Sequence, residues 1–175
     1  MPVHLDRPAP TSAGPLALTV HSGESFALAR PVVPFTRDGA GRLGSAYWHE
    51  VERSTRGAVR ARRTADSVEL RFFGRAPALL CFGAPEIQVD STGISCTYPV
   101  LGGLLARRAG GELVFEQRRS PAWCVRTLVR DFSPRLVARP GRAAWRGVVY
   151  HQVQARLHRT IGRRYVARLV RESLP

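Results

Sequence analysis

The sequence contains no lysine and no asparagine, and all 27 of its basic residues are arginines. Without lysine, the chain cannot form a Schiff base, hold pyridoxal phosphate covalently or supply the lysine of a Walker phosphate-binding loop. The Ser-x-x-Lys arrangement for acyl transfer is excluded for the same reason. A GC-rich genome favours arginine over lysine, but that bias does not explain 27 basic residues against 13 acidic ones.

Cysteine is also scarce. The three cysteines, Cys81, Cys96 and Cys124, include no C-x2-C pair, which argues against a zinc ribbon, a redox C-x-x-C motif and a disulfide framework. We expect them to be small apolar residues on strands, in a reducing compartment. His151 and His158 lie seven residues apart on a predicted helix, about 10 Å of rise, too far to chelate one metal. The sequence therefore predicts no metal site, and no cofactor motif is present.

Long apolar runs are absent as well. The longest uncharged run, Ser91 to Ala106, contains Ser, Thr, Pro and Gly and falls short of the roughly 18–20 apolar residues of a membrane-spanning helix. The N-terminus shows no basic segment followed by a sustained apolar stretch, so no signal peptide is indicated. We expect a cytoplasmic location, with peripheral attachment at the membrane as the alternative.

A chain of 175 residues with 44% hydrophobic residues is typical of one globular domain. Residues 1–15 contain four prolines and are predicted to be a flexible leader. Residues 16–175 are predicted to form a single β-rich domain that ends in a helix. Within it, Leu16–Val20 and Ser25–Ala29 are expected to be two strands, and the Pro- and Gly-rich residues 30–45 a loop.

From there the pattern alternates with a period of two, which favours half-buried antiparallel strands joined by short hairpins. Tyr47, His49 and Val51 are expected on one face of a strand. The clearest later strands are the runs around Val68–Phe72, Ile87–Val89, Ile94–Tyr98, Leu113–Phe115 and Trp123–Val129. In all, six to nine strands are predicted, with a turn at Ser91-Thr92-Gly93.

The period changes after Pro140-Gly141. Apolar residues then recur every four positions, which predicts a helix over about residues 142–172. They are Trp145, Val149, Val153, Leu157, Ile161, Tyr165 and Leu169. The predicted fold class is therefore α+β: a curved antiparallel sheet or a small barrel with one long C-terminal helix packed on it.

Positive charge is concentrated at the C-terminal end. Residues 107–175 hold 16 arginines and four acidic residues, a balance of +12, whereas residues 1–106 hold 11 arginines and nine acidic residues, a balance of +2. The candidate anion-binding residues are Arg156, Arg159, Arg163 and Arg164. This Arg-rich helix is either an ordinary solvated face, a surface for anionic membrane with Trp145, Tyr150 and Tyr165 as interfacial anchors, or a phosphate-binding surface for nucleic acid.

Two short motifs resemble functional sites, but their sequence surroundings do not support a function for either. Residues 39–44 match G-x-G-x-x-G, but the fingerprint needs a buried strand before it and a helix after it, and the sequence predicts neither. His49 stands beside Glu50, yet neighbouring residues of a strand point to opposite faces. No G-x-S-x-G nucleophile elbow is present, so a hydrolase is not indicated.

The order of elements, a run of antiparallel strands and then one long amphipathic helix, resembles the START-like superfamily of helix-grip proteins. The resemblance is architectural, covers about 100 residues and carries over no catalytic residue. The stretches that carry it are Val68–Phe73, Ile87–Tyr98, Glu112–Gln117, Ala122–Val129 and Trp145–Val170. It implies a fold that holds apolar ligands between sheet and helix, as polyketide cyclases and lipid carriers do. That family usually has short helices after its first strand, which residues 30–45 do not predict, so a lipocalin-like closed barrel is the alternative.

Two hypotheses of function follow. The first is binding, with cyclisation or isomerisation left open, of an apolar small molecule or lipid between sheet and helix. Its candidate ligand-binding residues are Tyr47, His49, Tyr98 and Trp123. The second is a non-enzymatic accessory protein that docks on anionic membrane or nucleic acid through the Arg-rich C-terminal helix. The sequence leaves open whether turnover occurs and what the oligomeric state is.

Overall fold

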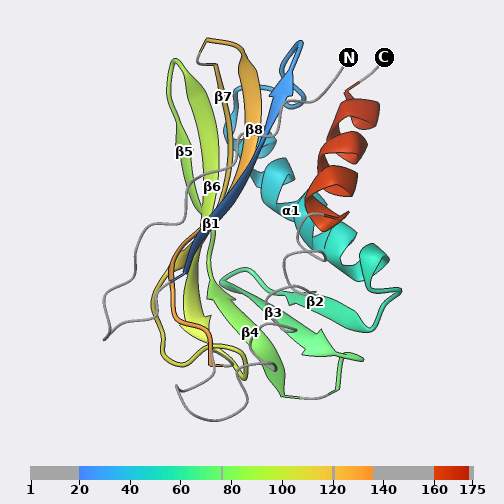
Figure 1. The fold of residues 1–175 in the computed structure, drawn as a ribbon, viewed down its shortest axis with the longest axis vertical. Helices are drawn as coiled ribbons and strands as arrows, with labels where there is room; N and C mark the ends of the chain where they lie inside the picture. The colour runs from blue at the N-terminus through green and yellow to red at the C-terminus, as the bar shows by residue number, and fades with distance from the viewer. Residues whose placement is uncertain (1–19, 76, 120, 136–159, 174–175) are drawn as a thin grey trace, which may run out of the picture.

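The computed structural model describes residues 20–75, 77–119, 121–135 and 160–173 (Figure 1). Eight strands and one long helix have the order β1-α1-β2-β3-β4-β5-β6-β7-β8, and a C-terminal helix over residues 160–172 follows. Their bounds are β1 Val20–Leu28, α1 Arg37–Ser54, β2 Val59–Arg63, β3 Ser67–Phe72, β4 Ala78–Gly83, β5 Glu86–Val89, β6 Gly93–Gly102, β7 Glu112–Arg119 and β8 Trp123–Phe132.

All strands belong to one curved antiparallel sheet with the order β1-β8-β7-β6-β4-β3-β2. Strand β6 pairs with β7 along one side; on its other side it pairs with β5 near its start and with β4 near its end. The predicted α+β class with a curved antiparallel sheet and a C-terminal helix is confirmed. The alternative of a closed barrel is wrong, because β1 and β2 are the two edges of an open sheet.

The expectation of a loop over residues 30–45 and a strand around Tyr47 is wrong, because α1 spans Arg37–Ser54. The Thr36 hydroxyl caps this helix by accepting a hydrogen bond from the Gly39 amide at 3.1 Å. The two prolines of residues 30–45, Pro31 and Pro34, precede the helix rather than interrupting it. Its buried residues include Leu43, Tyr47 and Val51, four residues apart, which fits a helical period as well as an alternating one. Tyr47 and Val51 therefore share a helix face, from which the exposed His49 points away.

Two further predictions change in detail. Residues 20–28 form a single strand, whereas the sequence predicts that one strand ends at Val20 and a second begins at Ser25. The C-terminal helix is confirmed over residues 160–172, whereas residues 142–159 of the predicted helix and the leader 1–15 lie outside the described residues. None of the described helices is both long enough and apolar enough to cross a bilayer.

The hairpins predicted from period-two alternation are present. At the β5–β6 turn, the Asp90 carboxylate accepts hydrogen bonds from the Thr92 and Gly93 amides at 2.7 and 2.8 Å. The three cysteines lie on strands β4, β6 and β8 and are free thiols, as expected.

A buried glutamine holds the connection between β1 and α1. Gln117 on β7 is fully buried, and its side-chain oxygen accepts hydrogen bonds from the Val32 and Val33 amides at 2.7 and 3.2 Å. Its amide nitrogen donates to the Val33 carbonyl at 2.8 Å. These bonds satisfy backbone groups of a buried loop that has no strand or helix partner, so the entry to α1 is fixed relative to the sheet.

The end of α1 is fixed to the edge of the sheet in a similar way. The Glu52 carboxylate accepts a hydrogen bond from the Ala61 amide at 2.8 Å, and the Thr55 hydroxyl accepts one from the Val59 amide at 3.1 Å. Both amides belong to β2, the edge strand. Side chains of α1 therefore satisfy donors that would otherwise be open to another chain.

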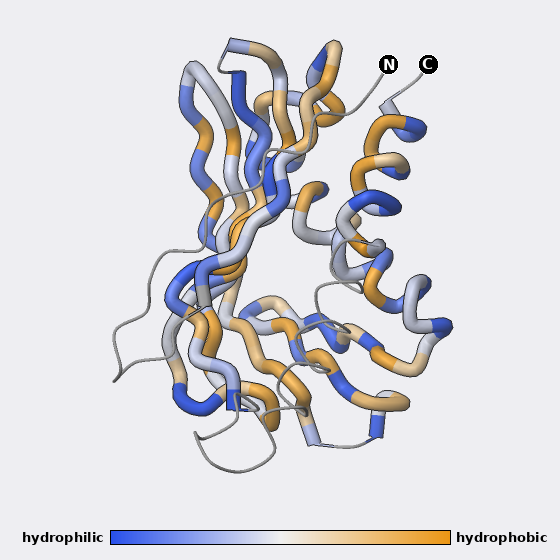
Figure 2. Tube along the Cα trace, in the orientation of Figure 1, coloured by the Kyte–Doolittle hydropathy of each residue, from blue (hydrophilic) through white to orange (hydrophobic). Residues whose placement is uncertain are grey.

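Both helices lie on the same face of the sheet (Figure 1). The core fills the space between them and the strands: α1 supplies Leu43, Tyr47 and Trp48, the sheet supplies Phe115, and the C-terminal helix supplies Tyr165. Hydrophobic and hydrophilic residues follow one another along the strands (Figure 2), and the buried hydrophobic ones belong to this core.

Candidate functional site

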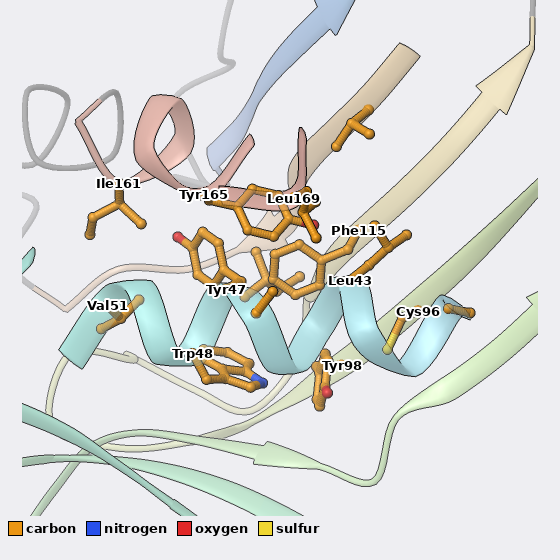
Figure 3. Close-up of a cluster of buried hydrophobic side chains, with 14 of the residues drawn as sticks. Leu43, Tyr47, Trp48, Val51, Cys96, Tyr98, Phe115, Ile161, Tyr165 and Leu169 are labelled. Carbon is orange, nitrogen blue, oxygen red and sulfur yellow. The ribbon is translucent and has the colours of Figure 1, made fainter. Parts of the chain in front are cut away.

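Two of the predicted ligand-binding residues, Tyr47 and Tyr98, lie within an aromatic layer between the helices and the sheet (Figure 3). Tyr47 contacts Phe115 and Tyr165, with ring centroids 4.7 and 5.6 Å apart. Tyr98 contacts Trp48 at 5.2 Å on the other side of α1. Both tyrosines are about 95% buried or more, since their exposed fractions are 4% and 5%. These rings fill the space in which the first hypothesis places an apolar ligand.

The other two predicted ligand-binding residues lie elsewhere. His49 is exposed on α1, away from the aromatic layer. Trp123 stands at the start of β8, half-buried, with its ring against Phe35 at 5.2 Å and under the Arg119 guanidinium at 5.6 Å. The structure thus brings together Tyr47 and Tyr98 through a shared aromatic layer, but neither His49 nor Trp123 joins them.

The aromatic layer changes the acidity of its polar members. Burial raises the pKa of Tyr47, and the nearby Glu24 carboxylate raises it further. Burial also raises the pKa values of Tyr98 and Tyr165, as well as the pKa of the Cys96 thiol. All four groups are therefore neutral at physiological pH, and the Cys96 thiol is unreactive there.

A polar groove lies beside this layer, where α1 meets the C-terminal helix. Its volume is about 350 Å³, and it is open to solvent. One wall consists of residues from α1, and the other of residues from the C-terminal helix. The lining residues are His49, Glu50 and Arg53 from α1, and Arg168, Arg171 and Glu172 from the C-terminal helix.

The two helices are held together across the groove by packing and by charge. Tyr165 contacts Tyr47 through a T-shaped ring pair, and Leu169 is fully buried. Above them, Glu172 accepts a hydrogen bond from the Arg168 Nε at 2.7 Å and lies 3.8 Å from the Arg42 guanidinium of α1. Glu172 is therefore already shared between two arginines.

Glu50 is the most buried charged residue of the groove, with 4% of its surface exposed. Its carboxylate accepts a hydrogen bond from the Ser54 hydroxyl at 2.9 Å. On the opposite helix, one terminal nitrogen of Arg168, Nη1, is buried and has no hydrogen-bond partner among the described residues. Unsatisfied buried donors are costly, so this guanidinium group has unused capacity to bind an acceptor.

Two of the four predicted anion-binding residues lie on the helix that forms one wall of the groove. Arg163 and Arg164 are exposed on the C-terminal helix, as a solvated face requires, whereas Arg156 and Arg159 lie outside the described residues. Within the described part of the chain, Arg53, Arg163, Arg164 and Arg171 form no ion pair. We call these four arginines the cationic face.

One expectation for the membrane hypothesis is wrong. Tyr165 was a candidate interfacial anchor, but its residue surface is 0% exposed, and its ring packs in the aromatic layer. Trp145 and Tyr150, the other candidate anchors, lie outside the described residues. Any interfacial aromatic contact from the described part of the chain must therefore come from another element.

The α1 wall of the groove is not predicted from the sequence, because the alternation of Tyr47, His49 and Val51 favours a strand there. The usable signal was the spacing of Arg42, His49 and Arg53, which lie on one side of a helix but on both faces of a strand. Chemically, the groove offers guanidinium groups and an imidazole to an anion, beside two carboxylates, Glu50 and Glu172, that already accept hydrogen bonds from Ser54 and Arg168. Among the described residues, no group of three His, Cys, Asp or Glu side chains is placed to hold a metal ion.

Comparison with known proteins gives no match, whether to family models, to curated protein sequences or to solved structures.

Proposed function

We propose that this protein is a binding module that docks on an anionic lipid surface through the cationic face and the groove beside it. The observation that carries the proposal is that four exposed arginines on two packed helices have no carboxylate partner among the described residues. An arginine near an anionic bilayer contributes about 1 kcal/mol to binding, so four together would give a strong, salt-sensitive attraction.

The geometry supports a preformed surface rather than a flexible one. Buried Ile161, Tyr165 and Leu169 fix one side of the C-terminal helix, so that Arg163, Arg164 and Arg171 occupy its outer side. Arg53 joins them from α1 across the groove. Phosphate and carboxylate groups of lipid headgroups match guanidinium geometry, because two N–H donors can bind two oxygens at once.

The test is co-sedimentation with vesicles of phosphatidylcholine alone and of equimolar phosphatidylcholine and phosphatidylglycerol. We expect binding only to the anionic vesicles at low salt. Replacing both Arg53 and Arg171 with glutamate should weaken that binding by at least tenfold, because two attractions of about 1 kcal/mol become repulsions.

The control has the same net charge. The Arg107→Glu/Arg108→Glu variant also lowers the formal charge from +14 to +10, but its substitutions lie in the exposed β6–β7 loop. It should retain most of the binding. If both double variants lose binding equally, net charge rather than the cationic face is responsible. If the protein binds single-stranded or duplex nucleic acid but no anionic vesicle, the lipid proposal is wrong.

The apolar-ligand hypothesis is a second candidate, favoured by the Tyr165 hydroxyl, which is buried without a hydrogen-bond partner among the described residues. A polar ligand group would satisfy it, but only if the rings that fill this layer moved apart to admit the ligand. Native mass spectrometry of the protein purified from cells tests this candidate: a stoichiometric adduct of a few hundred daltons supports it, and a bare protein counts against it.

A further inference from the structure

The turn between β3 and β4 exposes two aromatic rings side by side. Phe72 is 46% exposed and Phe73 is 63% exposed, the largest exposure among the large hydrophobic residues in the described part of the chain. Their rings form a T-shaped pair with centroids 4.6 Å apart. Leu104, 46% exposed, lies at the same end of the sheet, since its amide donates a hydrogen bond to the carbonyl of Ala78, the first residue of β4.

The backbone at Phe73 has a strained, left-handed conformation. Phe73 has φ +49° and the next residue, Gly74, has φ +72°, so both are left-handed. Glycine or asparagine suits that conformation, whereas a bulky side chain strains it by about 1–2 kcal/mol. The Phe73 amide donates a 2.7 Å hydrogen bond to the Ala58 carbonyl, which ties the turn to the residues just after α1. A strained, exposed phenylalanine stabilises neither the turn nor the core, which points to a role in binding.

Arginines surround the pair. Arg56 precedes Ala58, Arg60 lies opposite Arg71 in the β2–β3 register, and Arg75 follows the pair by two residues. Arg71 is paired with Glu69 at 2.9 Å, but Arg56, Arg60 and Arg75 are exposed and have no ion pair among the described residues. We call Phe72, Phe73 and these three free arginines the aromatic tip. In Figure 2, the end of β3 is strongly hydrophobic and lies next to hydrophilic segments.

We propose that the aromatic tip inserts into the interface of an anionic bilayer, with its arginines on the headgroups and its two rings at the acyl boundary. Aromatic rings beside cations are the composition that bilayer interfaces favour, and Leu104 adds an aliphatic group that has no use in stacking on nucleic acid bases. In Figure 1, the end of β3 and the end of α1 lie on the same side of the molecule as the C-terminal helix. This inference rests on the proposed lipid docking and adds an apolar contact to it.

The test compares wild-type protein with Phe73→Asn on the same two kinds of vesicle. Asparagine accepts the left-handed backbone, so the variant removes the ring without adding strain. We expect it to bind anionic vesicles about tenfold more weakly, because burial of an aromatic ring is lost. At 1 M salt, where the Debye length is about 3 Å, wild-type protein should keep a residual binding that Phe73→Asn lacks.

Leu101→Thr is the matched control. Leu101 is 55% exposed on β6 and lies near Gly83, at the opposite end of β4 from the aromatic tip. This variant removes an exposed apolar side chain while keeping strand propensity, and its vesicle binding should stay within about twofold of wild type. A Phe73→Trp variant should keep binding, and its added fluorescence should be quenched by lipids brominated on their acyl chains.

The outcomes separate the two proposals. If wild-type protein does not bind anionic vesicles, the proposed function and the insertion proposal are both wrong. If wild-type protein binds and Phe73→Asn binds equally well, the tip fails and docking through the cationic face stands. If Phe73→Asn weakens only nucleic acid binding or only self-association, the aromatic tip serves a different partner and the insertion proposal is overturned.

Discussion

Two groups of aromatic side chains in this protein have the same ring geometry and opposite surroundings. Trp48 and Tyr98 form a T-shaped pair at 5.2 Å inside the molecule, and Phe72 and Phe73 form a T-shaped pair at 4.6 Å outside it. Trp48 is 1% exposed, whereas Phe73 is 63% exposed. The ring–ring contact adds only about 0.5–1.5 kcal/mol beyond burial, so the buried inner pair stabilises the fold far more than the exposed outer pair does.

The same contrast applies to the polar groups near each pair. Inside, hydroxyl and thiol groups are kept neutral by burial, and the Trp48 indole nitrogen points toward Tyr98 (Figure 3) without a hydrogen bond of ordinary geometry. Outside, the neighbours include Arg56, Arg60 and Arg75, which are exposed and have no ion pair among the described residues. A closed neutral layer beside an open cationic surface is what a rigid docking module requires, because the first fixes the orientation of the second.

The largest expected effect distinguishes the two pairs by stability. Trp48→Ala should lower the free energy of unfolding by about 3–5 kcal/mol, since it removes a fully buried ring and leaves a cavity. Phe73→Asn should change it by less than about 1 kcal/mol, and in the stabilising direction, because the left-handed strain is relieved. Urea denaturation followed by circular dichroism measures both. A loss of more than about 2 kcal/mol in Phe73→Asn would show that the outer pair is part of the core after all.

A smaller effect tests how tightly the inner pair is packed. A Cβ atom on Gly44 would lie 2.5 Å from the Tyr98 hydroxyl oxygen and 2.7 Å from its ring, so α1 can approach β6 only because residue 44 has no side chain. Gly44→Ala should therefore lower the free energy of unfolding by about 1–3 kcal/mol through overpacking. The higher helix propensity of alanine should offset up to about 1 kcal/mol of that loss.

Gly41→Ala is the control in the same helix. A Cβ atom on Gly41 meets nothing within 4 Å, so this variant should be stabilising by about 0.5–1 kcal/mol. The difference between the two variants, measured by thermal unfolding, isolates the contact with Tyr98. Adding Tyr98→Phe to Gly44→Ala should recover part of the loss, because it removes the closest atom. Equal effects at the two glycines would mean that the inner layer has room to adjust.

These glycines also explain what the sequence could and could not predict. The hairpins from β5 to β8 follow directly from alternation and from turns such as Asp90–Gly93, which are local signals. Helix α1 was missed because Gly39 and Gly44 looked like loop residues, yet each serves a close approach to another segment: Gly39 to the Pro34 carbonyl and Gly44 to Tyr98. Tertiary contacts of this kind override local propensity and leave no periodic trace.

The candidate sites divide in the same way. Exposure of Arg163 and Arg164 follows from the four-residue period of Ile161, Tyr165 and Leu169, so it was predictable. The groove was not, since Arg53 faces Arg171 only once α1 is known to be a helix. The aromatic tip was not predicted either, because Phe72 shares a strand face with the buried Val68. Only the structure shows that this face is no longer buried at Phe72.

The last effect is zero at neutral pH and develops only in alkali. Burial raises the pKa values of Tyr47, Tyr98 and Tyr165, three of the four tyrosines in the chain, above the ordinary value of about 10. Above pH 10 the unfolded chain loses these protons and the folded protein keeps them, so stability is complete below pH 10 and falls as pH rises, by about 1.4 kcal/mol for each buried tyrosine per pH unit. Ultraviolet titration of tyrosinate should show at most one tyrosine ionising near pH 10, and the others only as the circular dichroism signal of the fold is lost. Three or more tyrosines that titrate reversibly near pH 10 in the folded protein would mean that solvent reaches the inner layer, and the contrast with the exposed Phe72–Phe73 pair would no longer hold.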